Sequence, residues 1–247
     1  MVPFWNSGIE YRIRLLSDDN QGGVVRHCQH VLYDEKNVLR AEKVHLLSYS
    51  TKRESAGTLI ELDLKALVEA KRVKSHPKQD VVVVEVATSD KPEIEQRELK
   101  PVPGVTLNRI APEGVWGPTT KSTLKFEEVA VGNEVLVPGF PSSIGLKNVP
   151  QIDRLKPLLR RGIVAGLNET LKTIIIDCPV FPGNSGGPVV QVDTTAFETN
   201  FRLIGVVSQF VPFDNSGWSA AVGGNATLLN SGFSVVVPID AVLELLD

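Results

Sequence analysis

Short runs of aliphatic and β-branched residues, each bounded by Gly, Pro, Asn or Asp, most limit what this chain can fold into. Many short strands with turn signals between them are typical of β-sandwiches and β-barrels, and little of the chain has the periodicity of a helix. We expect strands at residues 9–15, 43–49, 58–64, 81–86, 104–110, 134–137, 162–165, 173–177, 188–192, 202–207 and 233–237.

Three further patterns refine this prediction. The four valines at 81–84 are apolar on both faces and predict an interior strand. Residues 64–72 predict a short helix or turn. Residues 238–246 start at a proline and have the apolar spacing of a short helix.

A Pro- and Gly-rich segment at 100–120 separates the strands into two series, and we expect it to be a linker. The 247 residues are enough for two small domains. We therefore expect an all-β chain of two packed antiparallel β-barrels. The expected bounds are 1–110 for the first barrel, 111–237 for the second and 238–247 for a short C-terminal helix.

The decapeptide FPGNSGGPVV at 181–190 surrounds one serine, Ser185, with glycines. A serine hydroxyl is a poor nucleophile until a base accepts its proton, and the oxyanion that forms needs N–H donors aimed at it. Glycines allow a backbone tight enough to point successive N–H groups into one small hole. We expect Ser185 to be a nucleophile and the N–H groups of Gly183 and Ser185 to hold the oxyanion. A Gly-rich hairpin turn is the alternative.

An acid and a base should accompany such a serine. Asp80 stands at the start of the apolar run 81–84, where a partly buried carboxylate needs a partner; a histidine is a suitable one, and a turn aspartate is the alternative. Of the four histidines, His76 precedes a proline and fits a turn, and His45 fits a strand. We expect His30 to be the base and keep His27 as the alternative.

Together these segments resemble the trypsin-like (chymotrypsin-fold) serine peptidases, especially the compact non-zymogen members common in bacteria. RGIV at 161–164, followed by IIDCPVFPGNSGGPV at 175–189, is similar to the nucleophile segment of that family. The order His, Asp, Ser is the one that this fold uses. Shorter similar segments follow the family's order: HVL at 30–32, HPKQDV at 76–81, VPGFP at 137–141, GVVS at 205–208 and GFSVVVP at 232–238.

The resemblance also implies where a substrate binds. The primary pocket would be lined by the segment before Ser185, including Pro179, and by Ser208, Gln209 and Phe210. Pro179 stands where trypsin-like specificity needs an acidic residue, so we expect a modest apolar P1 side chain rather than Lys or Arg. Asn184 replaces the aspartate that pairs with a new N-terminal ammonium in zymogen-activated members. We therefore expect the site to fold without removal of a propeptide.

These residues predict a serine endopeptidase that cleaves peptide bonds through an acyl-enzyme, with His30, Asp80 and Ser185 as its triad. The alternative is a catalytically inactive trypsin-like fold that serves as a binding or scaffold module. The alternative applies if neither His27 nor His30 reaches both Asp80 and Ser185.

The net charge of −3 predicts no general attraction to nucleic acid or to anionic membranes. We see no signal peptide and no apolar run long enough to span a bilayer, so a cytoplasmic location is the default; a removed leader would mean secretion or the periplasm. The two cysteines allow at most one disulfide, and no Cys/His cluster has metal-ligand spacing. We expect no cofactor and no metal. The expected partners are a peptide or protein substrate, with targeting supplied by the cleft itself or by a partner domain or protein.

Overall fold

The computed structural model describes residues 10–11, 15–18, 22–47, 57–88, 100–109, 120–140, 149, 151–152, 157–214 and 228–246. The chain divides into two compact units. The first consists of residues 1–121 together with 242–247, and the second of residues 122–241.

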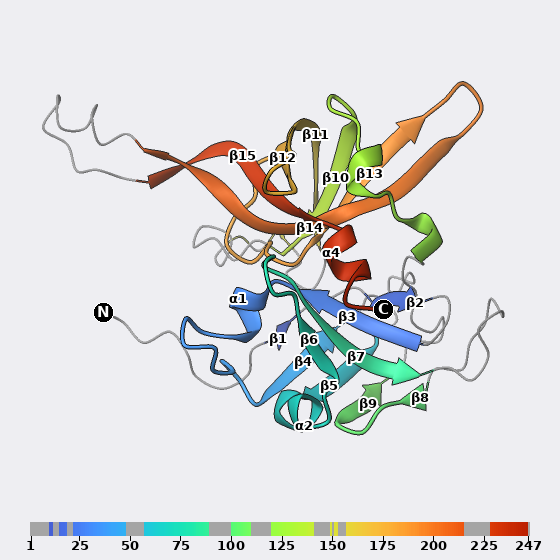
Figure 1. Ribbon diagram of the computed structural model, residues 1–247, viewed down its shortest axis with the longest axis vertical. Helices are drawn as coiled ribbons and strands as arrows, with labels where there is room; N and C mark the ends of the chain where they lie inside the picture. Colours follow the sequence, from blue (N-terminus) through green and yellow to red (C-terminus); the bar gives the residue numbers. More distant parts are fainter. Residues whose placement is uncertain are drawn as a thin grey trace, which may run out of the picture. The chain divides into compact units, whose positions relative to one another are not determined.

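The first unit is built from short strands and two short α-helices (Figure 1). The strands form one sheet in the order β1-β4-β5-β9 and another in the order β2-β3-β7-β6, with β8 pairing beside β7. In chain order the elements are β1 (Glu10–Tyr11), β2 (Leu15–Asp18), β3 (Gly22–His27), α1 (Gln29–Leu32), β4 (Lys43–Leu47), β5 (Leu59–Asp63), α2 (Leu64–Glu69), β6 (Val73–Ser75), β7 (Val82–Thr88), β8 (Lys100–Pro101), β9 (Val105–Arg109) and the 3₁₀ turn η1 (Thr120–Ser122).

β7 is an interior strand, as its valines predict. It pairs with β3 along one edge and with β6 and β8 along the other, all antiparallel. Val82, Val83 and Val84 are all buried, since both faces of the strand are covered. This position matters for function because Asp80 lies just before the strand begins.

α2 follows β5 directly and closes the core of this unit. The Asp63 carboxylate accepts a hydrogen bond from the Ala66 N–H at 2.9 Å and so caps the helix. The helix then buries Leu64 and Leu67 beside Leu62 of β5. Full burial of such side chains stabilises a fold by about 1.5–3 kcal/mol each.

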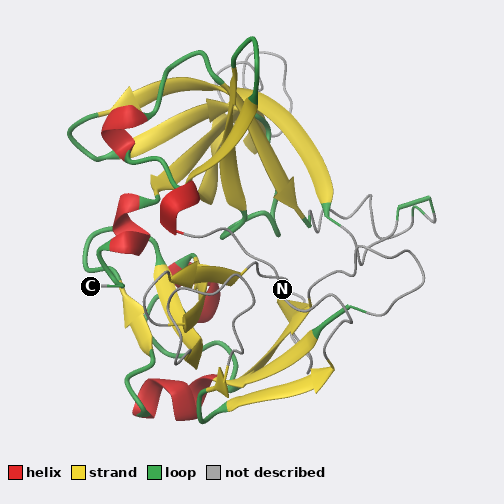
Figure 2. Cartoon of the chain, turned by 90° about the vertical axis from the view of Figure 1, so that its right-hand side faces the viewer, coloured by secondary structure: helices red, strands yellow, loops and turns green. Residues whose placement is uncertain are grey.

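The second unit is a closed antiparallel barrel in the order β10-β11-β12-β15-β14-β13, in which β13 pairs with β10 (Figure 2). Its core is made mainly of valine and isoleucine side chains from these strands. In chain order the elements are the 3₁₀ turn η2 (Phe126–Glu128), β10 (Glu134–Gly139), β11 (Leu158–Asn168), β12 (Thr173–Asp177), β13 (Pro188–Thr194), β14 (Thr199–Asp214) and β15 (Leu228–Pro238). The last helix, α4 (Asp240–Leu243), begins in the second unit, and its last two residues belong to the first.

The expected all-β, chymotrypsin-like fold class is confirmed. Two details differ from expectation. The described strands of the first unit form two sheets, and β1 pairs with β4 in parallel. The expected linker at 100–120 contains β8 and β9, which pair with β7 and β5 and so belong to the first unit.

Some expectations fall outside the described residues: residues 9 and 12–14 of the first expected strand, 48–49 of the second, 110 of the fifth, and most of the linker beyond β9. The expected C-terminal helix is shorter than its pattern, since α4 ends at Leu243 and turns follow. None of the helices in the described part of the chain has the length and apolar character that crossing a membrane requires.

Candidate active site

His30 and Asp80 form a polar pair in the first unit. The ring Nδ1 of His30 lies 2.6 Å from Asp80 Oδ2, and the backbone N–H of His30 donates to Oδ1 at 3.1 Å. A carboxylate only accepts hydrogen bonds, so Nδ1 carries the proton of this contact. In the neutral ring, the lone pair is then on Nε2, the nitrogen that a base would use.

Arg40 holds the short helix that carries His30. Its Nε donates to the backbone carbonyl oxygens of His30 and Tyr33, both at 3.0 Å, and so satisfies two of the carbonyls at the end of α1. The backbone of His30 is therefore fixed from two sides, by Arg40 and by Asp80.

His76 builds the turn that presents Asp80. Its N–H donates to the Val81 carbonyl at 3.0 Å, and its Nδ1 accepts from the Gln79 N–H at 2.9 Å. Nε2 of the same ring lies 3.0 Å from Glu244 Oε2. His76 is therefore structural, as its position before a proline suggests.

The other two histidines have different surroundings. His45 lies on β4 with Nε2 3.1 Å from Glu61 Oε2. His27 is buried at the end of β3, and its Nδ1 accepts a hydrogen bond from the Cys28 N–H at 2.9 Å. Burial, followed by the nearby charge of His30, lowers the pKa of His27 from 6.5 to about 4. His27 is therefore a neutral side chain near pH 7.

Ser185 occupies a tight turn in the second unit. The Asn184 N–H donates to Phe181 O at 2.9 Å, and the Gly187 N–H donates to Asn184 O at 2.9 Å. A third bond, from the Gly186 N–H to Val207 O at 2.8 Å, fixes the turn to β14. The Ser185 hydroxyl donates to the Ser208 carbonyl at 3.1 Å, so the structure brings these two predicted residues together.

The backbone of this turn leaves two donors available. Gly183 has φ of +95°, in the left-handed region that favours glycine. Among the described residues, neither the Gly183 N–H nor the Ser185 N–H has a hydrogen-bond acceptor. These are the two groups that the sequence analysis expects to bind an oxyanion.

The buried side chain of Asn184 anchors the turn. Its Oδ1 accepts from the Phe181 N–H at 3.3 Å. Nδ2 has no hydrogen-bond partner within the described residues. A Cβ on Gly139 of β10 would lie 2.0 Å from that nitrogen, so only glycine at 139 leaves room for Asn184.

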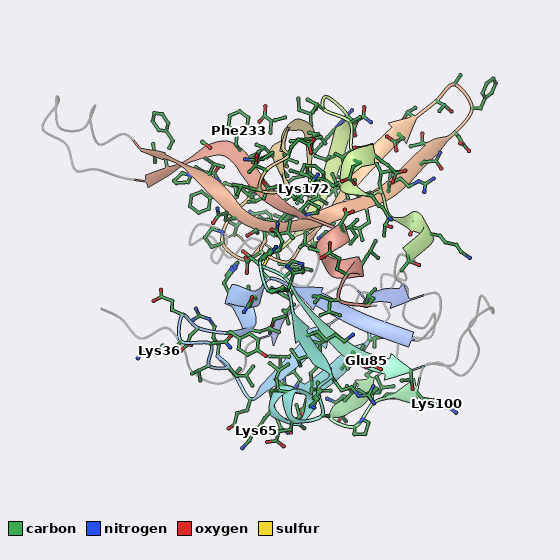
Figure 3. All side chains as sticks on the ribbon, in the orientation of Figure 1. Lys36, Lys65, Glu85, Lys100, Lys172 and Phe233 are labelled. Carbon is green, nitrogen blue, oxygen red and sulfur yellow. The ribbon has the colours of Figure 1, made fainter. Side chains whose placement is uncertain are left out.

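The predicted substrate-binding residues differ in exposure. Pro179 and Gln209 are exposed, Ser208 is buried, and Phe210 is half-buried against the barrel core. Phe233 of β15, labelled in Figure 3, pairs in register with Asp177 of β12 and is also exposed.

Three residues near these groups were not assigned a role from the sequence. Arg160 of β11 lies with its guanidinium 4.6 Å from the centre of the Phe181 ring, and Gly139 makes room for Asn184. Cys28 Sγ lies within 4.8 Å of ligand atoms of both His30 and Asp80. Of these contacts, only that between Cys28 and His30 joins residues close in the sequence. The other contacts join segments far apart in the chain, so the sequence gives no local sign of them.

This chain is similar to several solved structures. The HtrA-type protease AlgW, solved with a tripeptide, is 17% identical, with 91% of this chain and 51% of that chain covered and a TM-score of 0.42. Deg5 is 20% identical, with 91% and 77% covered and a TM-score of 0.42. The chain thus spans about half the length of the AlgW chain, and no curated protein matches it.

The family comparison covers more than half of the chain. A family described as "trypsin-like peptidase domain" matches residues 20–197, which include His30, Asp80 and Ser185. The chain belongs to the trypsin-like peptidase family.

Proposed function

We propose that this protein is a serine endopeptidase that cleaves peptide bonds through an acyl-enzyme, with Ser185 as nucleophile, His30 as base and Asp80 as the partner of the base. Membership of the trypsin-like peptidase family supports a peptidase. The observation that carries the finer proposal is the double contact between His30 and Asp80, at 2.6 Å and 3.1 Å.

The proposed reaction uses each of these groups in turn. The Ser185 hydroxyl transfers its proton to His30 Nε2 as Oγ attacks the scissile carbonyl carbon. The Asp80 carboxylate stabilises the imidazolium that forms, and the N–H groups of Gly183 and Ser185 stabilise the oxyanion. His30 then protonates the leaving amine. Water then attacks the acyl-enzyme while His30 accepts a proton from it. His30 returns that proton to Ser185 Oγ as the carboxylic acid product leaves.

The His30–Asp80 pair differs from a second histidine–carboxylate pair of the first unit, His45 and Glu61. His45 and Glu61 meet through one contact at 3.1 Å, and Lys43 shares the same carboxylate at 2.8 Å. Asp80 instead holds both the ring and the backbone of His30. Fixing the backbone and the tautomer together is what a general base requires.

For the substrate we propose an extended peptide with a modest apolar P1 side chain. Pro179 offers no negative charge for a Lys or Arg side chain, and Phe210 and Phe233 offer apolar surface on β14 and β15. The proposed lining is Pro179, Ser208, Gln209 and Phe210.

Labelling with a fluorophosphonate probe tests the proposed function. The unmutated protein should react, and Ser185→Ala and His30→Ala should reduce labelling to background. His45→Ala is the matched control, because it removes a histidine of another histidine–carboxylate pair and should leave labelling intact. His27→Ala tests the alternative base. No reaction of the unmutated protein would instead favour a catalytically inactive binding module.

A further inference from the structure

A sulfur, a nitrogen and an oxygen atom that can each bind a metal ion lie close together in the first unit. Cys28 Sγ, a ring nitrogen of His30 and a carboxylate oxygen of Asp80 all lie within 4.8 Å of one another, and Nδ1 is the His30 nitrogen that contacts Asp80. Cys28 is the N-cap residue of α1, and His30 lies within that helix. Asp80 lies just before β7. No metal was expected from the sequence, because no Cys/His cluster in it has metal-ligand spacing.

The donor set suits Zn²⁺. Thiolate sulfur, imidazole nitrogen and carboxylate oxygen are its three usual protein ligands, and a site with three of them leaves a fourth position for water. Tetrahedral Zn²⁺ with ordinary bond lengths needs Sγ and Nδ1 about 3.6 Å apart, and Nδ1 and the carboxylate oxygen about 3.4 Å apart. The sulfur must therefore approach by at most about 1 Å, and the 2.6 Å contact between His30 Nδ1 and Asp80 Oδ2 must open by about 0.8 Å.

The surroundings allow an ion to enter and the ligands to adjust. The side chains of His30 and Asp80 are 48% and 30% exposed, so solvent reaches them directly. Cys28 is fully buried, which places the sulfur on the inner side of the cluster. Asp80 Oδ1 already accepts from the His30 N–H, so this bond keeps the carboxylate in place while Oδ2 turns to the ion.

We propose that Cys28, His30 and Asp80 form a site for Zn²⁺ that inhibits the protein. On binding, the Cys28 thiol releases its proton to solvent, and the proton of His30 Nδ1 moves through solvent to Nε2. A ring that holds the metal at Nδ1 and a proton at Nε2 has no lone pair left to accept the proton of a serine hydroxyl. This inhibitory consequence rests on the proposed function, whereas metal binding itself does not.

Co²⁺ is the probe that reports binding without any need for activity. The full chain titrated with Co²⁺ should develop a thiolate-to-cobalt charge-transfer band at one ion per chain, and Zn²⁺ should remove it. Cys28→Ala should abolish the band, and Asp80→Asn should weaken Co²⁺ binding by at least roughly tenfold. Cys178→Ala is the matched control, because Cys178 is equally buried and should leave the band unchanged.

The unmutated protein decides the matter even if a variant fails to fold. Absence of a charge-transfer band in the unmutated chain, or a band that survives in a folded Cys28→Ala chain, overturns the site. Zn²⁺ should also slow fluorophosphonate labelling, with reversal by a chelator and no such slowing in Cys28→Ala. Labelling that saturating Zn²⁺ leaves unchanged overturns the inhibitory role, whereas no labelling without metal counts against the proposed function and leaves the cobalt result standing.

Discussion

At the scale of single residues, Asp80 combines a small contribution to stability with a large expected contribution to activity. Its contact with His30 is partly exposed, and such pairs contribute at most about 1 kcal/mol to stability. Its position beside Nδ1 nevertheless fixes which nitrogen of His30 carries the proton. Stability and activity should therefore respond very differently to a change at this residue.

Asp80→Asn should lower the rate of fluorophosphonate labelling by roughly 10³–10⁴-fold while the protein stays folded. The amide can donate to Nδ1, which places the ring proton on Nε2 and removes the base. Labelling kinetics measure the rate, and a thermal melt measures the stability. Glu61→Gln, which changes the carboxylate beside His45, should leave both nearly unchanged. An Asp80→Asn protein that labels at the normal rate would exclude Asp80 from the proposed triad.

At the scale of elements, the turn at 181–187 depends on a strand that contributes no expected reacting group. Asn184 packs against Gly139 of β10, and the turn is tied to β14 by the Gly186 N–H. Because Asn184 stands between the two expected oxyanion donors, a shift of its side chain moves both N–H groups. The position of β10 therefore sets the geometry of the turn.

Gly139→Ala should reduce fluorophosphonate labelling by at least about 100-fold, the cost of roughly 1 Å of misplacement in a reacting group. Its Cβ would stand 2.0 Å from Asn184 Nδ2 and 2.9 Å from Cγ, so the side chain must move. Overpacking should also cost about 1–3 kcal/mol of stability. Gly166→Ala, on β11 of the same barrel, meets no atom within 4 Å and should label normally. Equal labelling of the two variants would contradict the role of Gly139.

The elements also show which parts of the fold a sequence pattern can predict. The strand at Thr173–Asp177 has the expected bounds, since alternate residues are buried, a turn precedes the strand and a bend follows it. β14 and β15 extend well beyond their apolar runs, as pairs such as Phe213 and Leu229 continue the hairpin while both side chains stay exposed. Backbone pairing, rather than burial, determines where these two strands end.

The candidate site also has parts that the sequence predicts and parts that it does not. The turn around Ser185 is local, so its glycines predict it from the sequence. The contact between His30 and Asp80 joins residues 50 positions apart; it was expected because a nucleophilic serine needs a base and an acid, and the family resemblance points to the same pair. The approach of the Cys28 thiol and of Gly139 depends on side-chain directions in the folded chain, which spacing alone does not determine.

At the scale of the whole molecule, each unit has a hydrophobic core of its own, so each contributes separately to stability. His27 is one of the few polar side chains buried in the described residues, and it lies at the end of β3 in the first unit. Because its ring is kept neutral by burial, the stability of the fold depends on pH through this residue.

The free energy of unfolding should fall as the pH is lowered from about 6.5 toward 4. The pKa of His27 is about 4 in the fold and near 6.5 in the unfolded chain, so the unfolded chain takes up the proton first. The stabilisation is fully present above pH 6.5. About 2 kcal/mol of it is lost by pH 5, out of roughly 3 kcal/mol in total.

Urea unfolding at several pH values between 5 and 7 measures this dependence. His27→Gln should flatten the curve over that range, whereas His45→Gln, which changes a half-exposed histidine, should keep the slope of the unmutated protein. If the two variants have the same slope, His27 is not a neutral buried group. The same measurements separate folding from chemistry, because a loss of activity at a pH where the protein is still folded does not come from unfolding driven by His27.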